Sequence, residues 1–170
     1  MDYIFTLKYQ LNPGENDMDA LLGRLAEAGC DDAIIGIGQP GRIALEFTRE
    51  AESAEDAILS ALENVRSVLP EATLIEASPD MVGLTDVAAL TGMSRQNMRK
   101  LMLTYAESFP APIHEGSASI WHLAEILAWM QSRNIYTLTQ NLIEISQIAM
   151  RVNVAKEQQR LNSSPGALAV

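Results

Sequence analysis

The spacing of apolar positions in the first 80 residues predicts four strands. Residues 3–11 alternate strictly, with apolar side chains at every odd position, which is the pattern of a strand with one buried face. Shorter apolar stretches at 33–37, 42–48 and 73–77 follow turn-forming residues and are also predicted to be strands. The sequence therefore predicts a sheet with one face against a core.

Two helices are predicted between these strands. Apolar residues recur three and four positions apart from residue 18 to the glycine at 29, and again over 54–69. Asn16 or Asp17 and Ser53 stand where N-cap residues are expected. The resulting order, β-α-β-β-α-β, predicts an α+β domain over residues 1–78 with the ferredoxin-like arrangement.

The pattern of residues 84–104 predicts two short helices joined by a tight turn. The turn falls at Thr91-Gly92, because glycine tolerates the positive φ that ends a helix. Ser94 is a suitable N-cap for the second helix, whose apolar positions are 98, 101 and 102. Its outward positions carry side chains of the types that bind base edges and phosphates, namely Arg95, Gln96, Asn97, Arg99 and Lys100.

This region resembles the helix-turn-helix of phage excisionases and MerR-type regulators. The resemblance rests on the run Thr85-Asp86-Val87-Ala88-Ala89-Leu90-Thr91-Gly92-Met93-Ser94-Arg95, on Met98-Arg99, and on a following segment with Phe109-Pro110-Ala111-Pro112, Gly116 and Trp121. In excisionase-like domains such a segment forms a β-hairpin wing and leads into a closing helix. The resemblance implies a winged helix-turn-helix domain over residues 81–133 that binds double-stranded DNA.

The resemblance also implies roles for individual residues. The helix from Ser94 to Thr104 is expected to enter the major groove with its N-terminal end nearest the bases. Arg95, Gln96 and Asn97 would then lie near base edges, while Arg99 and Lys100 would hold phosphates or reach a second base. Thr85 is expected to donate to a phosphate, and His114 and Ser117 of the wing to contact the backbone or the minor groove. Excisionase wings often carry Arg or Lys, which this wing lacks, so few phosphate contacts are expected from it.

A long amphipathic helix is predicted over residues 135–161. Its apolar residues follow a 3-4-3-4-3 spacing typical of a heptad seam, and they are Ile135, Leu138, Leu142, Ile145, Ala149 and Val152. Two interpretations are open: the seam pairs two copies into a homodimer, or the helix covers the protein's own core. The heptad spacing favours the homodimer. Residues 162–170 predict a flexible tail.

Charge separates the chain into two parts. The formal net charge is −10, yet residues 1–80 hold 5 Lys and Arg against 16 Asp and Glu, whereas residues 81–134 hold 4 of each. A DNA-binding domain without excess positive charge predicts modest affinity per subunit. The acidic domain suggests a second hypothesis, in which it binds a protein partner, as in an antitoxin. A third is a small-molecule sensor that uses the glycine-rich loop at 36–41.

Several other functions are disfavoured by the sequence. No apolar run approaches the length of a membrane span, and the N-terminus has no secretory signal, so a cytoplasmic protein is expected. Cys30 is the single cysteine, which excludes an intramolecular disulfide. His114 and His122 have no further ligands at metal-binding spacing, and no nucleophile motif or phosphate-binding loop is present. We therefore expect no metal, no cofactor and no enzymatic activity, and we expect Trp121 and Trp129 to lie in the core.

Overall fold

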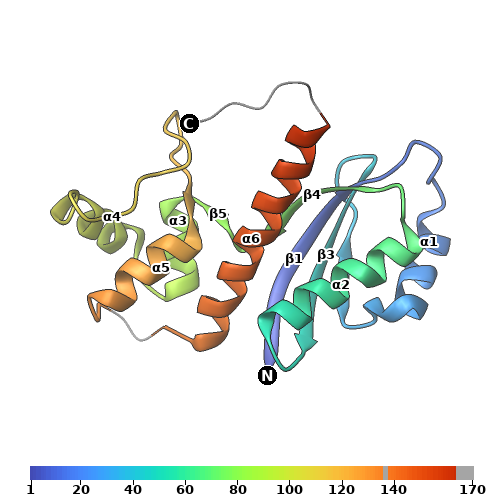
Figure 1. Cartoon of the computed structure of the whole chain (residues 1–170), viewed down its shortest axis with the longest axis horizontal. Helices are drawn as coiled ribbons and strands as arrows, with labels where there is room; N and C mark the ends of the chain where they lie inside the picture. Colours follow the sequence, from blue (N-terminus) through green and yellow to red (C-terminus); the bar gives the residue numbers. More distant parts are fainter. Residues whose placement is uncertain (136–137, 164–170) are drawn as a thin grey trace.

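The computed structural model of the protein describes residues 1–135 and 138–163. Figure 1 shows a sheet with its helices at one end of the molecule and a small helical unit at the other, with the last helix, α6 (Gln140–Asn162), running between them. The fold is α+β, as predicted, with an antiparallel sheet in the N-terminal part and a long C-terminal helix. No helix among the described residues is both long and apolar enough to span a membrane.

The N-terminal sheet has four antiparallel strands. They are β1 (Asp2–Gln10), β2 (Ala33–Gly36), β3 (Arg42–Glu50) and β4 (Thr73–Ser78), in the order β2-β3-β1-β4. The predicted alternation in β1 is confirmed, because its odd positions from 3 to 9 are buried and Ile4, Lys8 and Gln10 are exposed. One face of the sheet therefore packs against the core, and the other face is open to solvent.

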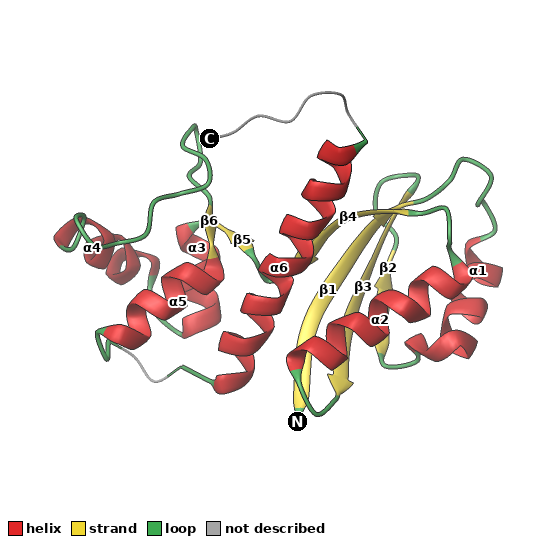
Figure 2. Ribbon diagram, in the orientation of Figure 1, coloured by secondary structure: helices red, strands yellow, loops and turns green. Residues whose placement is uncertain are grey.

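The two predicted helices of this unit are present. Asp17 caps α1 (Met18–Leu25) by accepting from the Ala20 amide, and Ser53 caps α2 (Ala54–Val68) by accepting from the Asp56 amide. The first helix continues as a short π-helical turn, η1 (Ala26–Cys30), in which Gly29 adopts a φ of 113°. The element order β-α-β-β-α-β is thus the predicted one, and Figure 2 shows α1 and α2 on the same side of the sheet.

Arg49 connects β3 to the helices above it. Its guanidinium binds both carboxylate oxygens of Asp32, at 2.8 and 2.9 Å, and donates to the Gly29 carbonyl. It also donates to Ser60 and Asn64 of α2, at 3.1 and 2.8 Å. The hydrogen bond to Asp32 raises the pKa of Arg49, so this largely buried group stays charged and ties η1, α2 and β3 together.

Helix α6 completes the helical layer over this sheet. It packs against β1, β4 and α2, and its residues Ile145 and Ala149 are fully enclosed in the same core as the strands. Leu142, Ile148 and Val152 border that core. The N-terminal sheet is therefore covered by α1, α2 and α6, the last contributed from 140 residues along the chain.

The residues of the predicted dimer seam pack within the chain. Ile145, Ala149 and Val152 lie against the N-terminal core, Ile135 and Leu138 lie against the core of the helical unit, and Leu142 touches both. All six seam residues therefore pack within the chain, where two internal surfaces cover the apolar stripe that the heptad spacing creates. The helix also begins at Gln140 rather than near residue 135. The predicted tail falls mostly on residues 164–170, which lie outside the described residues.

The helical unit has its own small core. It comprises β5 (Met81–Val82), α3 (Leu84–Thr91), α4 (Arg95–Thr104), β6 (Trp121–His122) and α5 (Leu123–Ser132), with β5 and β6 paired antiparallel. Val87, Met98 and Ile126 are buried at its centre. Trp121 and Trp129 are 5% and 8% exposed, which confirms that both tryptophans belong to the core.

Candidate nucleic-acid interface

The turn between α3 and α4 has the geometry that its sequence predicts. Gly92 has a φ of 75° and ends α3, while the Met93 amide donates to the Ala88 carbonyl at 2.9 Å. Ser94 then starts α4, its hydroxyl accepting from the Asn97 amide at 3.1 Å. Three residues, 92 to 94, thus connect the two helices.

One face of α4 anchors the helix and the other is free. Met98 is fully buried, and Leu101 and Met102 border the same core. On the opposite side, Arg95 and Arg99 are one turn apart, as are Gln96 and Lys100, and all four are exposed. Asn97 lies at the edge of this face, in line with partly buried Leu101.

The exposed side chains of α4 have no partner within the described part of the chain. No hydrogen bond or ion pair there involves the side chains of Arg95, Gln96, Arg99 or Lys100. The helix contains no acidic residue, so its three cations are not neutralised locally. The positive end of the helix dipole adds to this field at the N-terminus of α4, which is favourable for a phosphate.

The acidic domain lies away from this helix. Figure 1 shows α4 at the end of the molecule opposite α1 and α2, with α5 and α6 between. Over such a separation the charges of exposed groups are largely screened at physiological salt, where the Debye length is about 8 Å. The negative charge of residues 1–80 therefore does not cancel the local field of α4.

A hairpin lies between α4 and α5, where the wing is predicted. The Ile120 amide donates to the His114 carbonyl at 3.0 Å, and the Ile113 amide donates to the Ile120 carbonyl at 2.6 Å. His114 and Ile120 form an isolated antiparallel bridge, and the loop at 115–119 connects them. The His114 side chain lies against the loop: its Nε2 is 2.6 Å from the position that a Cβ on Gly116 would occupy. His114 and Ser117 are exposed here, beside Glu115.

Aromatic side chains hold the segment after α4. The ring centroids of Phe109 lie 5.9 Å from Trp121 and 5.1 Å from Trp129. The Trp121 Nε1 donates to the Pro110 carbonyl at 3.0 Å, and the Trp129 Nε1 donates to Ser108 at 3.1 Å. Arg133 lies over the Tyr105 ring, at 4.5 Å from its centroid. The end of α4 and the start of the hairpin are thereby fixed on α5.

A buried polar junction, which the sequence pattern did not predict, joins the two units. Asp80 is fully buried, with its Oδ1 2.7 Å from His122 Nδ1 and its Oδ2 accepting from Asn153 Nδ2 at 2.8 Å. Asn153 also donates to the Ala77 carbonyl and accepts from the Ala77 amide. A polar residue at a position in α6 otherwise flanked by apolar ones was the one signal available in the sequence.

The predicted DNA-binding residues fall on three elements. Six of them cap or follow the start of α4, namely Ser94, Arg95, Gln96, Asn97, Arg99 and Lys100. Thr85 is exposed on the first turn of α3, and His114 and Ser117 lie in the hairpin. Within the described residues, no group of three His, Cys, Asp or Glu side chains is placed to hold a metal ion.

Two helices joined by a tight turn, with a following hairpin and a closing helix, are an arrangement typical of small DNA-binding modules. Residues 80–134 match the model of a family described as prophage CP4-57 regulatory protein (AlpA). The match covers β5 through α5 and suggests a DNA-binding regulatory protein. No curated protein and no solved structure matches the chain.

Proposed function

We propose that this protein is a sequence-specific DNA-binding regulator in which α3 and α4 form a winged helix-turn-helix and α4 enters the major groove. The observation that carries the proposal is the exposed, unpaired face of α4, held rigidly by buried Met98 and by the Ser94 cap. The family match over residues 80–134 supports the same function. The protein acts, on this proposal, by binding rather than by catalysis, and in the cytoplasm.

Each side chain on α4 has a role that follows from its chemistry. Arg95 and Gln96 lie in the first turn, where a recognition helix approaches base edges; arginine pairs with guanine and glutamine with adenine. Arg99 and Lys100 lie one turn further and neutralise phosphates. Thr85, at the start of α3, donates to the backbone.

The small number of cations sets the affinity. If Arg99 and Lys100 each neutralise one phosphate, log K falls with log salt with a slope of about −1.8 per subunit. Such a weak electrostatic contribution favours binding by two subunits to a symmetric site. A homodimer remains part of the proposal, but its contact must use a surface other than the buried apolar stripe of α6.

The test is recovery of sheared genomic DNA by the purified full-length protein, followed by sequencing. Enrichment of a few sites that share a motif, lost in Arg95→Ala/Arg99→Ala, is the expected result. The matched control is Lys8→Ala/Arg151→Ala, which also removes two exposed cations but leaves α4 intact. Equal, unselective recovery by wild type and both variants would show that α4 does not select sequence.

A second candidate function is protein binding by the N-terminal sheet. Its open face exposes Ile4 and Ile34, which are 61% and 75% accessible, together with Glu46 and Glu50. Apolar residues rimmed by carboxylates suit a partner with a basic surface. Capture of a protein by the full chain, abolished by Ile34→Lys but retained by Arg95→Ala, would support this function independently of DNA.

A further inference from the structure

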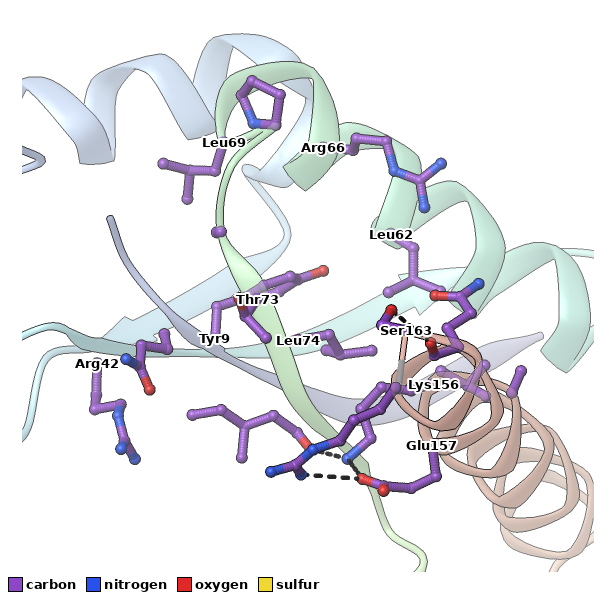
Figure 3. Close-up of a pocket in the computed structure, with 18 of the residues that line it drawn as sticks. Tyr9, Arg42, Leu62, Arg66, Leu69, Thr73, Leu74, Lys156, Glu157 and Ser163 are labelled. Atoms are coloured by element: carbon purple, nitrogen blue, oxygen red, sulfur yellow. Dashed lines mark hydrogen bonds and ion pairs between the residues drawn. The ribbon is translucent and has the colours of Figure 1, made fainter. Parts of the chain in front are cut away.

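A pocket of about 840 Å³ opens beside the N-terminal sheet, away from α4. Figure 3 shows its walls, which come from β1, β4, the second half of α2 and the last turns of α6. These segments are far apart in sequence, and the pocket exists only because α6 packs next to α2 over β4.

The lining combines an apolar surface with positive charge. Leu62, Leu74 and Val152 contribute apolar side chains from three different elements. Four cations also line it, Arg42, Arg66, Lys156 and Arg160, against the single carboxylate of Glu157. This is the reverse of the surrounding domain, in which acidic residues outnumber basic ones by 16 to 5 over residues 1–80.

Two of these cations are not used by the fold. Lys156 donates to the Ile75 carbonyl and pairs with Glu157 at 2.9 Å, and Arg160 also pairs with Glu157. Arg42 and Arg66, in contrast, make no side-chain hydrogen bond or ion pair with any described residue. Uncompensated positive charge at the wall of a concave site attracts an anion.

Tyr9 supplies an unused hydrogen-bond donor at the same place. Its side chain is 6% exposed and lines the pocket, yet its hydroxyl has no partner among the described residues. Burial raises the pKa of Tyr9, although the nearby positive charge of Arg66 acts in the opposite direction. The hydroxyl therefore stays protonated at neutral pH. Among the described residues no fully buried side-chain oxygen lacks a partner, so this hydroxyl reaches the open space of the pocket, where it can donate to a ligand.

We propose that this pocket binds a small organic acid, a carboxylate or phosphate carried on an apolar body. The apolar body lies on Leu62, Leu74 and Val152, and the anionic group is held by Arg66, assisted by the Tyr9 hydroxyl. Arg42 holds the opposite rim and favours ligands with a second acidic group. An anionic membrane surface is not the source, because the strongly acidic exterior of the domain would be repelled by it.

The pocket contacts the helix that joins the two units. Val152 and Lys156 line it, and Asn153 between them holds Asp80 and Ala77. A ligand bound against this turn of α6 therefore lies next to the junction that joins α6 to the helical unit. This regulatory consequence, unlike the binding itself, rests on the proposed function.

The binding test uses the fluorescent amphipathic anion 1-anilinonaphthalene-8-sulfonate with the full-length protein. Bound probe should be displaced by octanoate and by octyl phosphate, but not by octanol or inorganic phosphate at equal concentration. Arg66→Gln should weaken octanoate binding by about tenfold to hundredfold, the loss expected when one charged hydrogen bond is removed. Arg151→Gln, on α6 outside the pocket, is the matched control and should bind as the wild type does.

Each other outcome overturns the proposal. Equal displacement by octanol would identify a merely apolar surface, and displacement by inorganic phosphate alone would identify a simple anion site. Binding unaffected by Arg66→Gln and by Tyr9→Phe would place the ligand elsewhere. A large gain in probe binding after removal of residues 164–170 would mean that the chain's own C-terminal segment is the occupant. Recovery of DNA with and without octanoate then tests regulation separately, so a failure of DNA binding does not decide the pocket.

Discussion

The buried junction around Asn153 gives the sharpest test of how the two units are joined. Asn153→Leu keeps the size of the side chain but removes three hydrogen bonds, to the Ala77 amide, the Ala77 carbonyl and the Asp80 carboxylate. Ala77 and Asp80 are both fully buried, so none of the three groups can turn to bulk water instead. The cost is that of leaving buried polar groups unpaired, about 1–3 kcal/mol each.

The expected loss of stability is about 3–5 kcal/mol. Asp80 keeps His122 as a partner and the leucine side chain gains some burial, so the sum falls below three full penalties. In a chain of this length each kcal/mol lowers the melting temperature by about 2–4 °C, which predicts a fall of roughly 10 °C. A loss of that size is a large part of the total stability of a typical protein.

Urea denaturation followed by tryptophan fluorescence measures this loss, because Trp121 and Trp129 lie in the helical unit. Gln147→Leu is the control, since it makes the same kind of change at an exposed position of α6. Asn153→Leu should move the midpoint strongly and Gln147→Leu hardly at all. A loss below about 1 kcal/mol for Asn153→Leu would show that the three buried groups find other partners and that the junction contributes little to stability.

Four further outcomes are expected. Arg49→Met should destabilise the N-terminal unit by about 3 kcal/mol in denaturant titrations, because it leaves Asp32 and the Gly29 carbonyl without their partner; a neutral effect would show that the Arg49 hydrogen bonds do not stabilise the unit. Burial raises the pKa of the Cys30 thiol, so at pH 8 the native protein should react with a disulfide reagent far more slowly than the unfolded protein, and equal rates would show that the site opens freely. Gly92→Ala should cost about 1 kcal/mol from its positive φ alone and weaken DNA recovery, whereas Gly38→Ala, with open space around it, should do neither. A fragment of residues 80–163 should aggregate, because it exposes the apolar face of α6 around Ile145; a soluble, folded monomer would show that the units are independent.

The features that can be predicted from the sequence are those that depend on near neighbours in the chain. Alternation in β1 follows from the two-residue period of a strand on a core, and Ser53 and Ser94 cap helices because a hydroxyl at that position reaches an amide three residues on. Gly92 marks the α3–α4 turn because its positive φ suits glycine. The anchored and exposed faces of α4 follow from the spacing of Met98, Leu101 and Met102.

The tertiary structure alone decided which surfaces meet. A heptad stripe on α6 shows that an apolar face must be buried, but it does not name the partner, and the partner is this chain's own sheet and helical unit. The Asp80–Asn153 junction joins residues 73 positions apart, and the pocket is lined by Arg42, Arg66 and Lys156, which come from three different elements. No local pattern predicts such contacts, because they depend on where α6 packs against elements that are far away in the sequence.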